Sequence, residues 1–257
     1  LLNPALLGEP LPVSDAARAL FYLMNIGTAL SVVFFAAAWF TSRIRFEQAR
    51  SDELIDNMLP ARIAQQLKEG VPTIADAHKE VSVLFADICG FTNYSAQVSA
   101  EQLVHDLNMV FRRFDAIAVE FGVAKIKTIG DAYMVASGVP DARDDHAAAL
   151  ADFALALGDA VQQHLRPDGQ PFSLRMGIHS GPAVAGVIGT ARFAYDLWGD
   201  TVNTASRMES HGEPGRIQVS ARTAELLGDD FLLTPRGAID VKGKGTMELY
   251  FLEGRRN

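Results

Sequence analysis

Two aspartates stand in places where a carboxylate is costly without a cation. Asp87 lies near the end of the apolar run 81–88 (VSVLFADI), and Asp131 follows the glycine turn in KIKTIGDAYM. Burying two unpaired carboxylates close together is unfavourable, so a cation is expected between them if the two segments are neighbours. Mg²⁺ and Mn²⁺ bind through one or two carboxylates plus substrate phosphates, which fits a pair. Taken singly, either aspartate is also consistent with a helix cap or a turn residue.

An anion site is predicted directly after Asp87. Residues 88–92 (ICGFT) form a turn that runs into a helix. The first amides of a helix point outward and its dipole favours anions, so a triphosphate could lie there beside the ions. A single glycine before a helix has little specificity as a motif. Cys89 is interpreted as a packing residue, because nothing near it is placed to lower its pKa.

A second group of polar residues lies in the segment 195–209 (YDLWGDTVNTASRME). Its helix can be capped by Asp200 or Thr201. Asn203 and Arg207 are four residues apart and therefore share one face of that helix. An amide and a guanidinium that project together suit ribose and phosphate oxygens. A solvated helix face would explain Arg207 nearly as well.

Composition limits the classes of ligand. The formal net charge of -8 and the pI of about 5.2 argue against a nucleic-acid-binding face, so a polyanion must be bound locally. The turn 241–245 (VKGKG) offers two ammonium groups, although exposed hairpin lysines are common. The single cysteine excludes an intramolecular disulfide and a cysteine zinc cluster, and it fits a reducing compartment. The six histidines have no close metal-ligand spacing, which argues against a soft-metal site.

The elements that must position these residues follow a strand, helix, strand, strand, helix, strand order. This order predicts an α+β fold of the ferredoxin-like, split βαβ kind, in which the first strand and the hairpin are neighbours. Ser99 is expected to cap the first helix, with Gln102 as its capping-box partner. The expected strands are 81–88, 123–129, 132–137, a pair 172–179 and 183–188 around Gly181-Pro182, 217–219, 238–241 and 248–251; the expected helices are 101–121, 145–165, 201–210 and 221–227.

A membrane segment is predicted before this domain. The run 19–40 has no charged residue and is about the ~20 residues that cross a bilayer. Arginines follow the run while acidic residues precede it, which places everything after residue 42 in the cytoplasm. A buried core helix and a secretory signal peptide are the alternatives; the signal peptide lacks a basic region and a cleavage site. We therefore expect an extracytoplasmic segment 1–18, a transmembrane helix 19–41 and a cell-membrane location.

A helical linker, residues 42–72, is predicted to join the membrane helix to the domain. Pro60 should split it into pieces of about 42–58 and 60–69, with Gly70 and Pro72 ending the second piece. Apolar residues fall at mostly helical spacings along it. Such a seam usually pairs with a second copy of the helix, and the alternative is packing on its own domain.

These segments together resemble the class III nucleotidyl cyclase catalytic domain. The likeness runs from about Glu80 to Glu253, and the domain is expected to span 78–254. It rests on FADICGFT, KTIGDAYM, GIHSGP, YDLWGDTVNTASRMES and DVKGKG in the order of the family. The linker, with DELIDNMLPARIAQQL, resembles the helical transducer of the family. The resemblance implies conversion of a nucleoside triphosphate to its 3′,5′-cyclic monophosphate and pyrophosphate.

The resemblance also implies a role for each site residue. Two Mg²⁺ or Mn²⁺ ions would be held by Asp87, Asp131 and the main-chain carbonyl of Ile88. Adenine would be read by Lys127 and Asp196, and the transition state would be stabilised by Asn203 and Arg207. The terminal phosphates would be contacted by Lys242. The substrate-binding residues Gly90, Phe91 and Thr92 come instead from the anion site predicted above at the start of the helix.

In this family Lys127 and Asp131 would serve opposite sites of a head-to-tail dimer. One chain here has all six side chains that the resemblance assigns to the metal ions, the base and the transition state, so a homodimer would hold two complete sites. The leading interpretation is a membrane-anchored adenylate cyclase acting on ATP. A guanylate cyclase is the near alternative, because cyclases for GTP typically have an acid and a small polar residue in place of Lys127 and Asp196. A catalytically silent nucleotide-binding module is the third.

Overall fold

The computed structural model describes residues 14–71, 74–163, 169–188 and 193–256, with the backbone alone described for 53–58. It separates the chain into two compact units, Leu1–Met58 and Leu59–Asn257. Most of the expected segment 1–18 and the predicted stop at Pro72 lie outside the described residues. The apolar linker residues Leu54, Ile55 and Met58 are described by their backbone alone. Each unit is considered by itself below.

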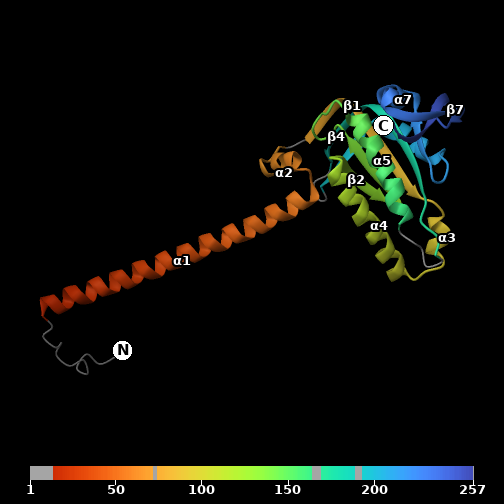
Figure 1. Ribbon diagram of the computed structural model, residues 1–257. Helices are drawn as coiled ribbons and strands as arrows, with labels where there is room; N and C mark the ends of the chain where they lie inside the picture. Colours follow the sequence, from red (N-terminus) through yellow and green to blue (C-terminus); the bar gives the residue numbers. More distant parts are fainter. Residues whose placement is uncertain (1–13, 72–73, 164–168, 189–192, 257) are drawn as a thin grey trace. The chain divides into compact units, whose positions relative to one another are not determined.

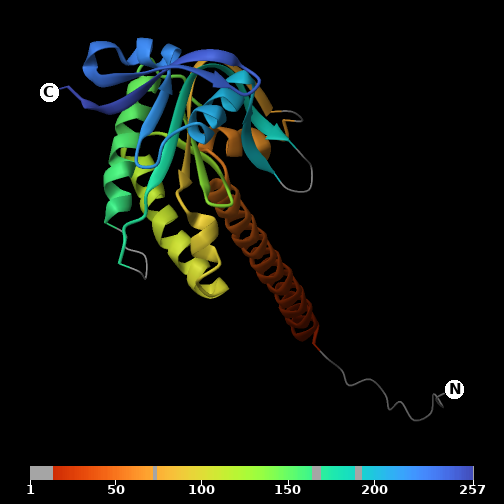
Figure 2. The same ribbon diagram turned by 90° about the vertical axis from the view of Figure 1, so that its right-hand side faces the viewer.

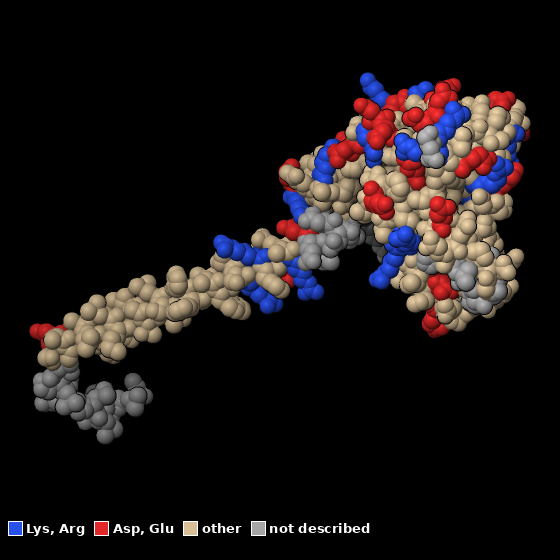
Figure 3. All heavy atoms as spheres, viewed as in Figure 1, with Lys and Arg blue, Asp and Glu red and all other residues tan. Residues whose placement is uncertain are grey.

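The first unit contains one continuous helix, α1 (Asp15–Met58). Its stretch Asp15–Asp52 is long and apolar enough to cross a membrane, and none of its apolar window is buried. Figure 3 shows a long part of the helix bare of charge, followed by a cluster of Lys and Arg. An all-round apolar helix needs lipid or protein around it. The helix α1 is therefore a candidate membrane span, and its helical conformation continues into the expected linker.

The second unit begins with the short helix α2 (Ala61–Lys68). Pro60 precedes it as the N-cap residue, and Gly70 beyond its end has a φ of +76°. A proline lacks the amide donor needed inside a helix, and a positive φ favours glycine. The predicted break near Pro60 and the stop at Gly70 are both confirmed. Ile63 and Ala64 of α2 are fully buried.

The core of the second unit is the predicted split βαβ fold. Its strands lie in the order β2-β3-β1-β4, and each neighbouring pair is antiparallel. Figures 1 and 2 both show α4 and α5 side by side on one face of this sheet. The elements are β1 (Ile74–Ile88), α3 (Phe91–Ser95), α4 (Ala100–Glu120), β2 (Ala124–Ile129), β3 (Ala132–Ser137), α5 (His146–Gln162) and β4 (Leu174–Ile188).

The sheet continues beyond β4 through β6, β8 and β7, while β5 pairs with the far end of β4. The strand β6 runs parallel to β4, and β8 runs antiparallel to both β6 and β7. The remaining elements are β5 (Ala194–Trp198), α6 (Asp200–Ser210), β6 (Ile217–Ser220), α7 (Ala221–Leu227), the 3₁₀ turn η2 (Gly228–Asp230), β7 (Phe231–Val241) and β8 (Gly245–Arg255).

Apolar side chains between the sheet and α4 and α5 form the main core. Tyr133 of β3 and Phe114 of α4 meet edge to face, with ring centroids 5.4 Å apart. The Tyr133 hydroxyl donates to Asp115 Oδ1 at 2.6 Å, which satisfies its polar end. The hairpin that carries Asp131 is thereby fixed to α4. Other fully buried members are Leu84, Leu150, Phe153, Leu157 and Ile178.

Three sequence expectations need correction. The expected strand pair around Gly181-Pro182 is one strand, β4. It tolerates Pro182 because the pairing with β1 shifts register between His78 and Val81, so no ladder bond is needed there. The strand β5 was not expected, and the closing strands are longer than 238–241 and 248–251.

The cap of α4 is half of the predicted capping box. Ser99 Oγ accepts from the Gln102 amide at 3.2 Å, as expected. The Gln102 side chain instead donates to Asp106 Oδ1 at 2.7 Å. The Ser99 side chain therefore caps one of the free amides at the start of the helix. The Gln102 side chain bonds a residue one turn further along the helix and does not return to the Ser99 amide.

Candidate active site

The two predicted metal-ligating aspartates converge. Asp87 lies near the end of β1, and Asp131 lies in the turn between β2 and β3. The strands β1 and β3 are antiparallel, with Ala86 opposite Tyr133. Asp87 follows Ala86 and Asp131 lies two residues before Tyr133, so both aspartates lie just beyond this pair, at the same end of the two strands. Asp131 raises the pKa of Asp87 through its charge and through a hydrogen bond between the two side chains. The condition set by the sequence, that the two carboxyls be neighbours, is met.

The electrostatics of Asp87 favour a cation. Burial is the largest cause of its raised pKa, followed by the charges of Asp131 and Glu209, and the value reaches about 6 despite the opposing charge of Arg175. No group of three or more potential ligands among His, Cys, Asp and Glu occurs in the described part of the chain. Two carboxylates without a third side chain of these types suit a hard divalent ion that takes its remaining ligands from other oxygens, such as those of main-chain carbonyls, phosphate and water.

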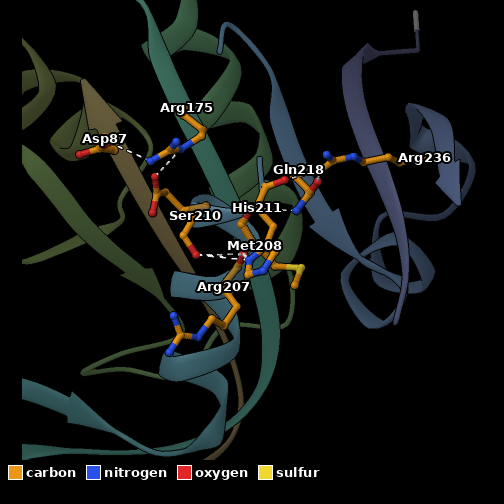
Figure 4. A network of polar contacts seen from close by, with 9 residues as sticks. Asp87, Arg175, Arg207, Met208, Ser210, His211, Gln218 and Arg236 are labelled. Carbon is orange, nitrogen blue, oxygen red and sulfur yellow. Dashed lines mark hydrogen bonds and ion pairs between the residues drawn. The ribbon is translucent and has the colours of Figure 1, made fainter. Parts of the chain in front are cut away.

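Arg175 is a candidate site residue that the sequence reasoning missed. It lies on β4 directly opposite Asp87 of β1. Its Nη2 is 3.1 Å from Asp87 Oδ2, and its Nε is 2.7 Å from Glu209 Oε1. Figure 4 shows the Arg175 guanidinium directed toward Asp87, with a dashed line marking their contact. An arginine beside a metal-ligating carboxylate can exchange that partner for a phosphate oxygen. The signal in the sequence was a lone charge in the strand LRMGI.

Gly177 explains why Glu209 reaches Arg175. A Cβ at Gly177 would lie 2.0 Å from the backbone nitrogen of Glu209 and 2.4 Å from the carbonyl carbon of Met208. The helix α6 therefore crosses β4 at backbone contact, which only glycine permits. Glu209 is only 8% exposed, and its charge is matched by Arg175.

The turn after Asp87 has the predicted form. Gly90 has a φ of +73° and is the N-cap residue of α3, so Phe91 and Thr92 begin that helix. The Cys89 amide donates to the Ser173 carbonyl at 2.8 Å, which ties the turn to the start of β4. Burial raises the pKa of the Cys89 thiol, in keeping with its interpretation as a packing residue.

Lys127 and Asp196 form a second pair. Lys127 Nζ donates to Asp196 Oδ2 at 2.5 Å, and so joins β2 to β5. The side chains are 40% and 20% exposed, so the pair is open to a ligand. Asp196 Oδ1 also accepts from the Leu197 amide at 2.8 Å, which orients the carboxylate. No hydrogen bond or ion pair between described residues links this pair to Asp87 or Asp131.

Asn203 and Arg207 project from α6 as expected. Asn203 is exposed and Arg207 is half-buried. Figure 4 shows the Arg207 guanidinium pointing away from the contact between Asp87 and Arg175. The expected cap is wrong, because Gly199 is the N-cap residue. Thr201 instead donates to the Pro182 carbonyl at 2.6 Å.

The two lysines of the turn between β7 and β8 differ in their surroundings. Lys244 donates to Asp200 at the start of α6, and only 19% of its side chain is exposed. Lys242 is exposed. Within the described ranges, no ion pair or hydrogen bond engages its ammonium group. Of the two, Lys242 is therefore the one available to a ligand.

Comparison with known proteins agrees with this geometry. Residues 74–254 match the adenylate and guanylate cyclase catalytic domain. The chain is 48% identical over 234 residues to an adenylate cyclase of Mycobacterium tuberculosis, an alignment that covers 90% of this chain and 53% of that protein. The chain thus spans about half the length of the mycobacterial relatives that it matches.

Solved structures of similar fold include cyclases named for either nucleotide. The guanylate cyclase domain of a Catenaria anguillulae protein, in complex with GTP, is 38% identical with a TM-score of 0.69, over 70% of this chain and 100% of that one. An adenylyl cyclase of P. aeruginosa is 31% identical with a TM-score of 0.66, over 71% of this chain and 97% of that one.

Proposed function

Because this chain belongs to the class III nucleotidyl cyclases, whose catalytic domain it contains, we propose that it converts ATP to 3′,5′-cyclic AMP and pyrophosphate. The observation that carries the choice of ATP is the contact between Lys127 and Asp196 at 2.5 Å. An ammonium donor and a carboxylate acceptor complement adenine, whose N1 accepts and whose exocyclic amine donates. The likeness to an adenylate cyclase at 48% identity supports the same substrate.

Class III cyclases use divalent metal ions, and the donor set here fits them. The proposed ligands are the carboxylates of Asp87 and Asp131 and the main-chain carbonyl of Ile88, with two Mg²⁺ or Mn²⁺ ions per site. The raised pKa of Asp87 supports this assignment, because a paired cation would relieve the repulsion between the carboxylates. When bound, such ions lower the pKa of a ribose 3′ hydroxyl and neutralise a departing pyrophosphate.

The other residues of the chain would bind and orient the triphosphate. Arg207 would meet negative charge developing at the α-phosphate, and Asn203 would orient the ribose on the same face of α6. Lys242 would contact the terminal phosphates. The turn Gly90-Phe91-Thr92 offers backbone amides beside Asp87, and Arg175 offers a guanidinium there.

Cyclase catalytic domains bind nucleotide and commonly dimerise, and we infer a homodimer with shared sites. The pair of Asp87 and Asp131 and the pair of Lys127 and Asp196 use separate contacts within one chain. A second copy placed head to tail would bring Asp87 and Asp131 of one chain close to the other chain's Lys127–Asp196 pair, which is proposed to recognise adenine. The helix α1 would hold this dimer at the cell membrane. The second unit, Leu59–Asn257, which contains the catalytic domain and is called the catalytic unit below, would lie in the cytoplasm.

One experiment tests the proposal against its two alternatives. The full chain is purified in detergent and incubated with Mn²⁺ and either ATP or GTP while cyclic product is measured. Cyclic AMP as the preferred product supports the proposal. Preferred cyclic GTP would establish the guanylate cyclase, which the similarity to a GTP-bound domain keeps as the second candidate. No product from either nucleotide would leave a silent nucleotide-binding module.

A further inference from the structure

Arg62 fixes the first helix of the catalytic unit, α2, to two separate segments. Its Nη2 donates to Asp76 Oδ2 at 2.6 Å and to the Pro140 carbonyl at 3.0 Å. Its Nε lies 3.5 Å from Asp141 Oδ1. One guanidinium therefore joins α2 to the start of β1 and to the loop between β3 and α5. Ile63, the next residue of α2, is fully buried, so this helix also packs through an apolar side chain.

The register of the sheet shows what lies beyond this contact. Val187 of β4 pairs with Ile74 of β1 on one side and with Tyr195 of β5 on the other. Residues in register share a face of the sheet, and positions two apart along a strand share it too. Asp76, the partner of Arg62, therefore faces the same side as Tyr195.

Asp196 faces the opposite side of the same strand. Its partner on β4 is Gly186, one position from Val187. Because successive strand residues alternate between the faces, Tyr195 lies on the α2 side while Asp196 lies on the side of Lys127. A shift of β5 at Tyr195 must therefore displace the Asp196 carboxylate.

Tyr195 belongs to the surroundings of Arg62. It is 7% exposed, and its hydroxyl has no hydrogen-bond partner among the described residues. Burial raises the pKa of the phenol to about 12, with Arg62 acting to lower it and the carboxylates of Asp76 and Asp141 acting to raise it. The ring, rather than the hydroxyl, supplies the stabilising contact, because an unpaired buried hydroxyl is itself unfavourable.

We propose that Arg62 is a positioning residue for base recognition: through Asp76 it holds α2 on the face of the sheet that also carries Tyr195 of β5, and so sets the place of Asp196 on the opposite face. This inference rests on the proposed function, in which Asp196 and Lys127 read adenine. It gives α2, which directly follows the candidate membrane helix along the chain, a route to the nucleotide site. Movement of α2 would change the selectivity for the base before it changed the chemical step.

The test is the ratio of kcat/KM for ATP to kcat/KM for GTP, measured on the full chain in detergent with Mn²⁺. Arg62→Ala is expected to lower this ratio roughly tenfold, mostly through KM for ATP, because a misplaced carboxylate loses the exocyclic amine of adenine. Asp76→Asn keeps the side-chain volume and removes the ion pair to Arg62 while the contacts of Arg62 with Pro140 and Asp141 remain, so it should lower the ratio in the same direction but by less. The double variant should lose no more than Arg62→Ala alone.

Matched variants separate positioning from general stability. Tyr195→Phe keeps the ring and should leave the ratio unchanged, whereas Tyr195→Ala should lower it as Arg62→Ala does. Arg255→Ala removes an ion pair to Asp152 of α5, away from this contact, and should leave the ratio for ATP and GTP unchanged. Equal losses for ATP and GTP, or a wild-type ratio in folded Asp76→Asn, would overturn the inference alone. A wild-type chain that forms no cyclic product would overturn the proposed function and this inference with it.

Discussion

Lys127 and Asp196 meet at 2.5 Å although 69 residues separate them in the chain. The contact joins the hairpin β2–β3 to the strand β5, although β1 and β4 lie between them in the order of the sheet. Both side chains keep part of their surface in solvent. The pair is therefore built by the fold before any ligand arrives, with a donor and an acceptor side by side.

Replacing Lys127 and Asp196 by side chains with the opposite hydrogen-bonding properties should change the preferred nucleotide. Lys127→Glu combined with Asp196→Ser replaces the donor by an acceptor, which suits the N1 hydrogen and amino group of guanine. We expect kcat/KM for ATP to fall by roughly 100-fold or more and the value for GTP to rise, since unpaired polar groups reject the wrong base strongly. Steady-state kinetics with both nucleotides measure the change.

A matched control for this exchange lies two residues away. Lys125→Glu introduces the same charge on β2 and leaves Asp196 untouched, although it removes the contacts of Lys125 with Asp115 and with the Tyr133 ring. It should leave the preference for ATP intact. Retained use of ATP by the Lys127→Glu, Asp196→Ser variant would show that the pair does not read the base.

Mixed dimers test whether the sites are shared. Asp131→Ala and Lys127→Ala should each abolish turnover as homodimers. In a mixture, random pairing makes half of the dimers mixed, and each mixed dimer restores one of two sites, so about a quarter of wild-type activity is expected. Cyclic product formed by the coexpressed variants measures it.

The mixture needs a control for assembly. Dimer formation by each variant is followed by light scattering in detergent. The double variant Asp131→Ala, Lys127→Ala, mixed with either single variant, should stay below the activity of the complementing mixture. An inactive mixture of the two single variants that still dimerise would show that each site lies within one chain.

Asn203 should matter for the chemical step more than for binding. Its exposed amide shares a helix face with Arg207, and its side chain makes no hydrogen bond to another described residue. Asn203→Ala is therefore expected to lower kcat at least about 100-fold with little change in KM, as for a group that acts in the transition state. Ser210→Ala, an exposed position on the same helix, serves as the control. An unchanged kcat for Asn203→Ala would remove Asn203 from the transition state.

The sequence was sufficient where local chemistry decides the structure. The turn at Gly130 and the polar ends of two apolar runs placed Asp87 and Asp131 on neighbouring strands, and Pro60 marked the end of the long helix. Residues four apart on α6 had to share a face. In each case the deciding contact lies within a few residues, or follows from a sheet order that the alternation of elements predicts.

The missed features depend on contacts between distant segments. Pro182 looked like a strand end, and its tolerance inside β4 depends on a register shift in β1. Arg175 became a site residue only when β4 placed it opposite Asp87. Lys242 and Lys244 are equivalent in sequence, and Asp200, more than 40 residues away, distinguishes them by pairing with Lys244.

Without metal, Asp87 should destabilise the folded chain above its own pKa. Its pKa is raised from an ordinary 3.8 to about 6, so the folded state binds a proton more readily than the unfolded state, and this contribution to stability is lost as pH rises through about 6. Asp87→Asn should therefore stabilise the metal-free chain at pH 8 by up to about 3 kcal/mol, with a smaller gain at pH 5. Thermal unfolding in EDTA measures both values.

Metal should reverse the effect of that substitution. Mn²⁺ at pH 8 is expected to raise the Tm of the wild-type chain and to leave the Tm of Asp87→Asn nearly unchanged, because binding to the folded state alone stabilises it. Asp144→Asn, a carboxylate away from the site, should respond to Mn²⁺ as the wild type does. Equal stabilisation of all three by Mn²⁺ would exclude Asp87 as a ligand.

His179 should make the catalytic unit sensitive to acid. Its Nδ1 is hydrogen-bonded to Ser220 Oγ at 2.7 Å, and burial, the largest cause, lowers its pKa to about 4. Between about pH 6.5 and pH 4 the unfolded imidazole takes up a proton that the folded one does not, so stability falls as pH falls through this window. From pH 7.5 to pH 4.5 the loss should be about 2.5 kcal/mol.

Urea unfolding of the wild type and of His179→Gln at both pH values separates the contribution of His179 to the free energy of unfolding from that of other titrating groups. Trp198 fluorescence reports the catalytic unit once Trp39 of α1 is replaced by Phe. The difference in unfolding free energy between wild type and variant should shift by about 2.5 kcal/mol toward the variant at pH 4.5, because glutamine takes up no proton. His105→Gln, at an exposed position of α4, should show no such shift. A difference that is the same at both pH values would mean that His179 is as easily protonated in the folded chain as in the unfolded one, and the burial that holds it neutral would not be present in solution.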